Sequence, residues 1–573
     1  MSTIKLFGKA FEGKEIDFAI INKVAVKRGF LVHSDCCTQE VMDFLLSRPT
    51  DYNSTFYKSW DEIISKSRFE IWIDQINSYI ANYITGVQYV PNEGSDQPAF
   101  TNLKVILPIT KEEANERCCD MLYSGIALSA DTLSMVLELV TDIDVEKVKN
   151  REAMMALHKK FNTVPTDNIE FVRYLIFLAT GKPLLIKDKA TIQALKVAKI
   201  DLKSLVNSFG IEKLSEVFLR YRLLFLAMKK GNEATVNKLR SLANKYHKPM
   251  KVGFFETILS DVSLIPQLSE KLKDCSNFKK VLLLQTIMVR QKELDMRFFG
   301  IRNGKLWAKE EKMVTKNHYT ILYSIIYQSL VDTISSKATS VKLPKGVKLT
   351  LPTSEKSFIG NYPLGTSFDL TGTDTIVGIH RLAKDAAGYL DFSLTTSTNE
   401  KIGWNSKFKN EECTILFSGD ICDPRRSKEV AELFYCKEGF KGAYILKVNN
   451  YERDETVPFK FFIAQEVISN LKKNYMVNPN NIKFTIDLAM ESKEQSIGVI
   501  NSDKLILATF RTGNKTIAGD SITNKYVDYA LNTLDCYLDL EKVLTDAGFT
   551  INCGNETLDF TTLSKDSLIK LLG

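Results

Sequence analysis

The chain has 573 residues, of which 44% are hydrophobic, 25% charged and 10% aromatic. This balance is typical of globular proteins and excludes a disordered, collagen-like or coiled-coil chain, and the length predicts roughly three or four domains. The formal net charge of +7 is slight when spread over this length, so it permits an RNA partner without indicating one.

The sequence also bears on location. The stretch formed by the first nine residues is short and polar, and a charged stretch follows it. This pattern argues against a secretory signal. Apolar runs fall far short of the roughly 18–20 residues that span a bilayer, so we expect no membrane insertion. The ten cysteines form two vicinal pairs and six single positions, without zinc-type spacing. We therefore expect reduced thiols in a cytoplasmic protein.

Residues 1–110 mix short strand-like and helical pieces, and residues 111–334 show apolar positions at helical spacing. The clearest helix is expected over Glu212–Lys230, buried on more than one side because Leu219 and Leu223 widen its apolar stripe. A second helix is expected to end at Gly181, at the close of the stretch from Glu170 to Thr180. The sequence thus predicts a mixed α/β module followed by an α-helical domain.

The composition changes at residues 335–356, a segment rich in Ser, Thr, Lys and Pro that we expect to be a linker. Beyond it, alternating apolar residues such as Leu390, Phe392 and Leu394 predict an antiparallel β-sandwich over residues 357–512. Residues 513–573 predict a C-terminal helical appendage. The expected fold class is α+β, with a helical N-terminal half before the sandwich.

The sequence contains no phosphate-binding glycine loop, dinucleotide fingerprint, zinc-protease motif or nucleophile elbow, and its five histidines are dispersed. Catalytic groups can still converge in a fold, but nothing here favours an enzyme. We therefore expect a non-catalytic protein.

Acidic residues gather in the sandwich region, at Asp391, in the loop that holds Asp420 and Asp423, and at Glu432. Calcium binds roughly six to eight hard oxygen ligands, and a polar strand face beside a Gly-Asp loop can bring such oxygens to one rim of a sandwich. The alternative is that these carboxylates form turns and face solvent.

Several segments occur here in a characteristic order: Phe358–Leu370, Ile376–His380, Leu390–Leu394, Ile402–Trp404 and Phe417–Asp420. In this order they resemble a TerD-like domain, the calcium-binding β-sandwich of the tellurite-resistance and stress-protein family, over residues 358–510. Residues 164–186, 218–230, 244–250 and 301–305 are similar to large uncharacterised bacterial and phage proteins that carry such a domain on their C-terminal side.

The resemblance implies Ca²⁺ as a cofactor, and four ligand positions carry over to this chain: Asp391, Asp420, Asp423 and Glu432. The chain departs from the family at Tyr389, where the family has an acidic residue, and two arginines follow Asp423. Both changes weaken divalent binding. The implied role is a binding or sensing protein in a tellurite- or stress-response type of system, with a protein partner or self-association.

Two other roles stay open. The chain is alternatively a phage or bacterial assembly component with a degraded metal site. The second alternative is an RNA-binding scaffold. Its support is a run of basic residues that can contact successive phosphates of an RNA backbone, and this run contains Lys238, Arg240, Lys245 and Lys248. The competing interpretation of that run is a solvated helix face whose lysine stems cover apolar surface.

Overall fold

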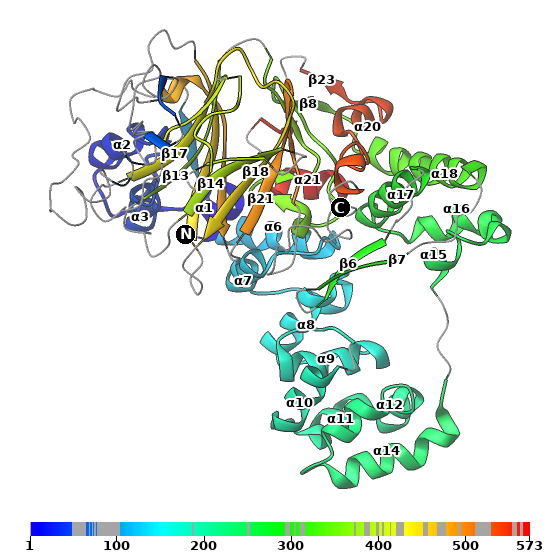
Figure 1. Cartoon of the computed structure of the whole chain (residues 1–573). Coiled ribbons are helices and arrows are strands. Elements are labelled where there is room, and N and C mark those ends of the chain that lie inside the picture. Colours follow the sequence, from blue (N-terminus) through cyan, green and yellow to red (C-terminus); the bar gives the residue numbers. More distant parts are fainter. Residues whose placement is uncertain are drawn as a thin grey trace.

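The computed structural model shows a helical N-terminal half followed by a mostly antiparallel sheet region, so the expected α+β class is confirmed (Figure 1). A few positions between residues 65 and 76 are described, together with these ranges: 2–48, 103–185, 188–248, 253–292, 298–302, 305–309, 316–371, 374–382, 390–396, 400–403, 406–412, 414–419, 429–450, 457–466, 477–490, 494–509, 529–552, 558–561 and 565–573.

Within the described residues, two antiparallel sheets pack face to face as a sandwich. The first sheet has the order β15 (Lys401–Ile402), β14 (Leu390–Thr396), β18 (Ala443–Asn450), β21 (Glu494–Asn501), β22 (Lys504–Leu507), β12 (Ser367–Asp369) and β9 (Val347–Lys348). The second has the order β16 (Ile415–Phe417), β17 (Glu429–Cys436), β13 (Thr375–Leu382), β19 (Val457–Gln465) and β20 (Ile482–Met490). Phe392 and Phe434 meet between the sheets, with ring centroids 5.2 Å apart.

The main helices pack into one apolar core, which we call the helical body. It comprises α1 (Ser2–Phe7), α6 (Lys111–Tyr123), α7 (Ala130–Leu139), α8 (Arg151–Lys160), α15 (Phe254–Thr257), α16 (Ile265–Lys273), α17 (Asn277–Gln291), α18 (Lys316–Ser335), α20 (Leu540–Asp546) and α21 (Lys565–Leu572). The C-terminal helix α21 packs on α6, and the Asn277 side chain donates to the Leu572 carbonyl at 2.9 Å. The helices of the C-terminal appendage therefore share the core of the helical domain.

The segment expected as a linker, residues 335–356, contains two short strands. One is β8 (Ser340–Lys342), which pairs in parallel with β23 (Thr550–Ile551) and β24 (Leu558–Asp559). The other is β9, at the edge of the first sheet of the sandwich. Val341 and Leu351 are fully buried in the core of the helical body. This segment therefore joins the body to the sandwich through packed structure.

A hairpin of β6 (Phe298–Arg302) and β7 (Lys305–Lys309) precedes α18.

The N-terminal module has a small parallel sheet in the order β1 (Lys9–Phe11), β5 (Lys104–Ile109) and β3 (Phe30–Val32). Helices α2 (Phe18–Val26) and α3 (Gln39–Leu46) cover it, and β2 (Gly13–Lys14) pairs with β4 (Cys36–Cys37). Arg48, just after α3, contacts Asp487 on β20 with a 2.5 Å N–O distance, which links this module to the sandwich.

Residues 164–248 form a separate helical module that extends away from the sandwich (Figure 1). Its elements are α9 (Asn168–Thr180), α10 (Lys189–Val197), α11 (Leu202–Phe209), α12 (Ile211–Phe218), α13 (Arg222–Ala227) and α14 (Glu233–Tyr246). Its buried side chains form a cluster of their own, which runs from Phe171 to Ala243. As expected, α9 ends at Gly181, which adopts the left-handed conformation with φ of +70°.

The prediction of one helix over Glu212–Lys230 is wrong, because α12 and α13 are separate helices. The chain leaves helical geometry at Tyr221, which has φ of −111° and ψ of 23°. Leu219 and Leu223 are 41% and 59% exposed, so the wider apolar stripe is not buried on a second side. The change of direction allows α12 to pack on α14 while α13 packs on α10. Among the described residues, no helix combines the length and hydropathy needed to cross a membrane.

Candidate functional site

The acidic positions of the sandwich lie on two different sheets. Asp391 lies on β14 of the first sheet, and Glu432 lies on β17 of the second. Both side chains are buried, with 6% and 2% of their surface exposed. Asp420, Asp423 and Tyr389 lie outside the described residues.

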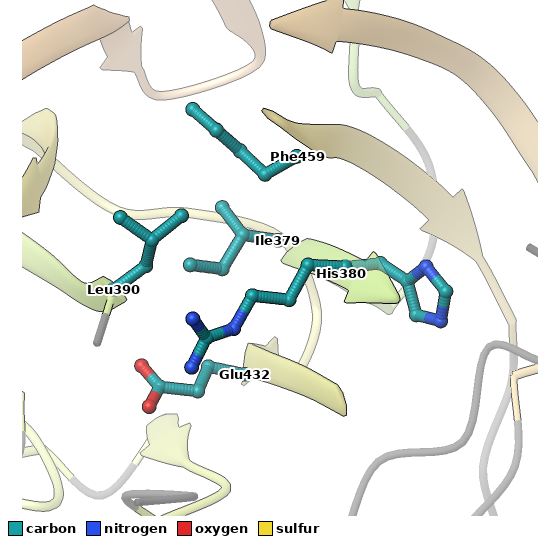
Figure 2. A pocket seen from close by; sticks show the side chains of 6 residues that line it. Ile379, His380, Leu390, Glu432 and Phe459 are labelled. Carbon is teal, nitrogen blue, oxygen red and sulfur yellow. The ribbon is translucent and has the colours of Figure 1, made fainter. Parts of the chain in front are cut away.

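Glu432 points into the space between the sheets. Its Oε2 accepts a hydrogen bond from the backbone N–H of Phe392, at 2.9 Å, on the facing sheet. It also lines a cavity of about 10 Å³, room for about one water molecule, with Leu390, Ile379 and Phe459 around it (Figure 2). The Glu432 carboxylate thus ties the two sheets together at a buried polar position.

Arg381 also lines this cavity and is 5% exposed. In the register of β13 and β17, Ile379 pairs with Glu432, and Arg381 lies two residues further on the same face. A buried guanidinium therefore contributes positive charge beside the Glu432 carboxylate. That charge opposes the entry of a divalent cation.

Asp391 lies on the opposite face of β14. Its neighbours Leu390 and Phe392 belong to the inner core, so strand alternation directs Asp391 to the outer face. Lys401 lies beside it, where burial lowers the pKa of Lys401 and the Asp391 carboxylate partly opposes that shift. An ion pair between Lys447 and Glu494, with a 3.2 Å N–O distance, belongs to the same neighbourhood. Asp391 is therefore part of a polar cluster with lysines.

The two described ligand candidates come from facing sheets: Asp391 projects from the outer face of β14, whereas Glu432 reaches the backbone of Phe392 from β17. Among the described residues, no group of three or more His, Cys, Asp or Glu side chains has the geometry of a metal site. The set of Asp391, Asp420, Asp423 and Glu432 as calcium ligands stays a prediction.

The four basic residues predicted to bind nucleic acid lie on or next to α14, unlike the two described acidic candidates, which lie on two sheets. Lys238, Arg240 and Lys245 are all exposed on α14, whereas Val236 and Leu239 are buried. Lys248 follows the helix and forms an ion pair with Glu216 of α12, with a 2.8 Å N–O distance. The structure therefore places three of the four predicted cations on one helix, with Lys238 and Lys245 on one side of its exposed surface and Arg240 on the other.

Three further polar side chains share this exposed face: Asn237, Ser241 and Asn244. The sequence reasoning missed them because it considered only the charged residues of the run. Their spacing of four and three residues along one helix was the available signal.

The charge of the chain is concentrated in the helical module. Residues 164–248 contain 16 Lys and Arg against 7 Asp and Glu, a formal charge of +9, while the whole chain has +7. The rest of the chain therefore has a formal charge of −2. The average over the whole chain concealed this concentration, which becomes visible once the buried cluster of the module defines its boundaries.

Most acidic residues of the module have structural roles. Asp167, Asp188 and Asp201 are N-caps of α9, α10 and α11, where their side chains accept backbone N–H hydrogen bonds. Glu170 pairs with Arg173, and Glu216 pairs with Lys248. Lys238 and Arg240 form no ion pair with any described residue, so their charge is available at the surface.

Comparisons of the chain with family models, curated proteins and solved structures found no match.

Proposed function

We propose that the protein is a non-catalytic scaffold that binds nucleic acid through its helical module. The observation that supports this most is the formal charge of +9 on residues 164–248, against −2 on the rest of the chain. Lys and Arg side chains that neutralise phosphates release condensed counterions, which supplies the sequence-independent part of nucleic-acid affinity. A protein whose positive charge lies in one module directs that module toward a polyanion.

The position of the module agrees with this role. It has its own buried cluster and extends from the helical body, and α14 lies at its outer end, far from the sandwich (Figure 1). A long polymer can therefore approach α14 without meeting the body. The sandwich and the body then serve as the platform that holds the module.

The test measures binding of a labelled RNA of about 20 nucleotides to the full chain by fluorescence anisotropy, between about 50 and 200 mM salt. We expect affinity to fall steeply with salt. The triple variant Lys238→Gln, Arg240→Gln and Lys245→Gln removes three phosphate contacts, so the slope of log K against log salt should become shallower by about 2.

The matched control removes three exposed cations from the helical body, with Lys271→Gln, Lys273→Gln and Lys279→Gln. It changes the net charge of the chain by the same amount but leaves the module intact. If both triple variants bind RNA equally well, or if affinity is the same at every salt concentration, the proposal is wrong.

A further inference from the structure

The exposed face of α14 has an ordered pattern of side chains. At 3.6 residues per turn, Asn237, Ser241 and Asn244 fall within an arc of about 60° and form one line along the helix. Lys238 and Lys245 lie on one side of this line, and Arg240 lies on the other. Neutral hydrogen-bonding side chains are thus flanked by cations on both sides.

This arrangement matches what a groove-binding helix requires. Amide side chains read base edges through paired hydrogen bonds, while Lys and Arg contact the phosphates of the strands that border the groove. From Asn237 to Asn244 the helix rises about 10 Å, which covers about three base pairs at 3.4 Å each. The line of neutral side chains therefore has the length of a short base sequence.

The support behind α14 is rigid. The Asn232 side chain, just before the helix, accepts from the Leu202 N–H at 3.1 Å and donates to the Ile200 and Met228 carbonyls at 3.1 and 3.0 Å. At the other end, the Lys248 N–H donates to the Glu216 carbonyl at 3.0 Å. Both ends of α14 are therefore fixed to neighbouring elements, so its exposed face is held in one orientation.

The shape of the face distinguishes between polymers. An α-helix with side chains is about 10–12 Å wide, and the major groove of B-form DNA is about 12 Å wide. The major groove of A-form RNA is deep and narrow, so side chains cannot read it. A single strand offers no groove.

We propose that α14 inserts into the major groove of B-form duplex DNA, with Asn237, Ser241 and Asn244 against base edges and Lys238, Arg240 and Lys245 against the two backbones. This inference rests on the proposed nucleic-acid function and names its polymer. The Ser241 hydroxyl donates to the Lys238 carbonyl at 2.8 Å, so its oxygen remains available as an acceptor.

The experiment uses the full chain and four labelled ligands of matched sequence: duplex DNA, duplex RNA, single-stranded DNA and single-stranded RNA. We expect duplex DNA to bind at least about tenfold more tightly than duplex RNA at equal salt. Selection from randomised DNA duplexes should then yield a preferred site about three base pairs long for α14.

The decisive variants are Asn237→Ala and Asn244→Ala, singly and together. Each should weaken binding to the selected site by about tenfold and leave both the affinity for unselected DNA and the salt slope unchanged. Asn207→Ala, at an exposed position of α11 in the same module, is the matched control and should alter neither. Circular dichroism confirms that each variant retains its helices.

The outcomes separate the two proposals. Equal affinity for all four polymers overturns the groove-binding role of α14. So does equal affinity of the unchanged chain and both Asn→Ala variants for the selected site. Either result leaves a salt-dependent nucleic-acid function intact. A preference for either RNA form also overturns it. Failure to bind any of the four polymers overturns both proposals.

Discussion

Replacing Asn232 with Ala should loosen α14 selectively. Its side chain makes three hydrogen bonds, to Leu202, Ile200 and Met228, at 3.0–3.1 Å. Each such bond contributes about 1 kcal/mol net, so their loss should lower the free energy of local opening by about 3 kcal/mol. Backbone amides of α14 should then exchange hydrogen more than about 100-fold faster in hydrogen-exchange mass spectrometry.

Two further variants test whether the Asn232 hydrogen bonds cause this change in exchange rate. Asn232→Asp keeps the acceptor for the Leu202 N–H and loses both donated bonds, so its exchange rates should lie between those of the unchanged chain and those of Asn232→Ala. Asn237→Ala lies five residues later on the exposed face and should change protection by less than about 0.5 kcal/mol. Equal protection in Asn232→Ala and Asn237→Ala would refute the role given to Asn232.

The remaining predictions concern other parts of the chain. Because Arg381 shares the Glu432 cavity, millimolar Ca²⁺ should leave the melting temperature of the full chain unchanged. A rise in melting temperature that Asp391→Asn abolishes would contradict this and show that the four carboxylates hold calcium. Burial lowers the pKa of His158 below 6.5, so the unfolded chain binds a proton first as the pH falls. Stability should therefore decrease below about pH 6.5, and denaturant midpoints of His158→Gln should show a weaker decrease. Gly360 has φ of +58° and an added Cβ would lie 2.2 Å from an Ile486 methyl, so Gly360→Ala should destabilise the sandwich by about 2–5 kcal/mol in calorimetry. Gly181→Ala, with φ of +70° and open space around it, should cost only about 1–2 kcal/mol.

Local patterns in the sequence predicted much of the secondary structure. Gly181 predicted the end of α9, and the alternation of Leu390, Phe392 and Leu394 predicted β14 and the face that packs in the sandwich core. These features depend on a few adjacent residues, which is why they can be read directly. The break at Tyr221 has no glycine or proline to mark it, and only the packing of α12 and α13 on different helices explains it.

The candidate sites show a different limit. Asp391 and Glu432 were both expected at one rim of the sandwich. Whether their side chains converge depends on the face of its own strand from which each side chain projects. Register across two sheets sets that face, and a one-residue difference reverses it. The basic face of α14 needed only helical spacing, so Lys238 and Lys245 could be placed together from the sequence alone.

The path of the chain through its cores has a consequence for biosynthesis. The core of the helical body joins residues as distant as Leu6 and Leu572, whereas that of the helical module lies within residues 171–243. Contacts between distant residues form late because a long loop must close first. On the ribosome, the module can therefore fold as soon as its own residues emerge. The body must wait with exposed apolar surface until α21 has been synthesised, and a chaperone that protects nascent chains would act on it during that interval.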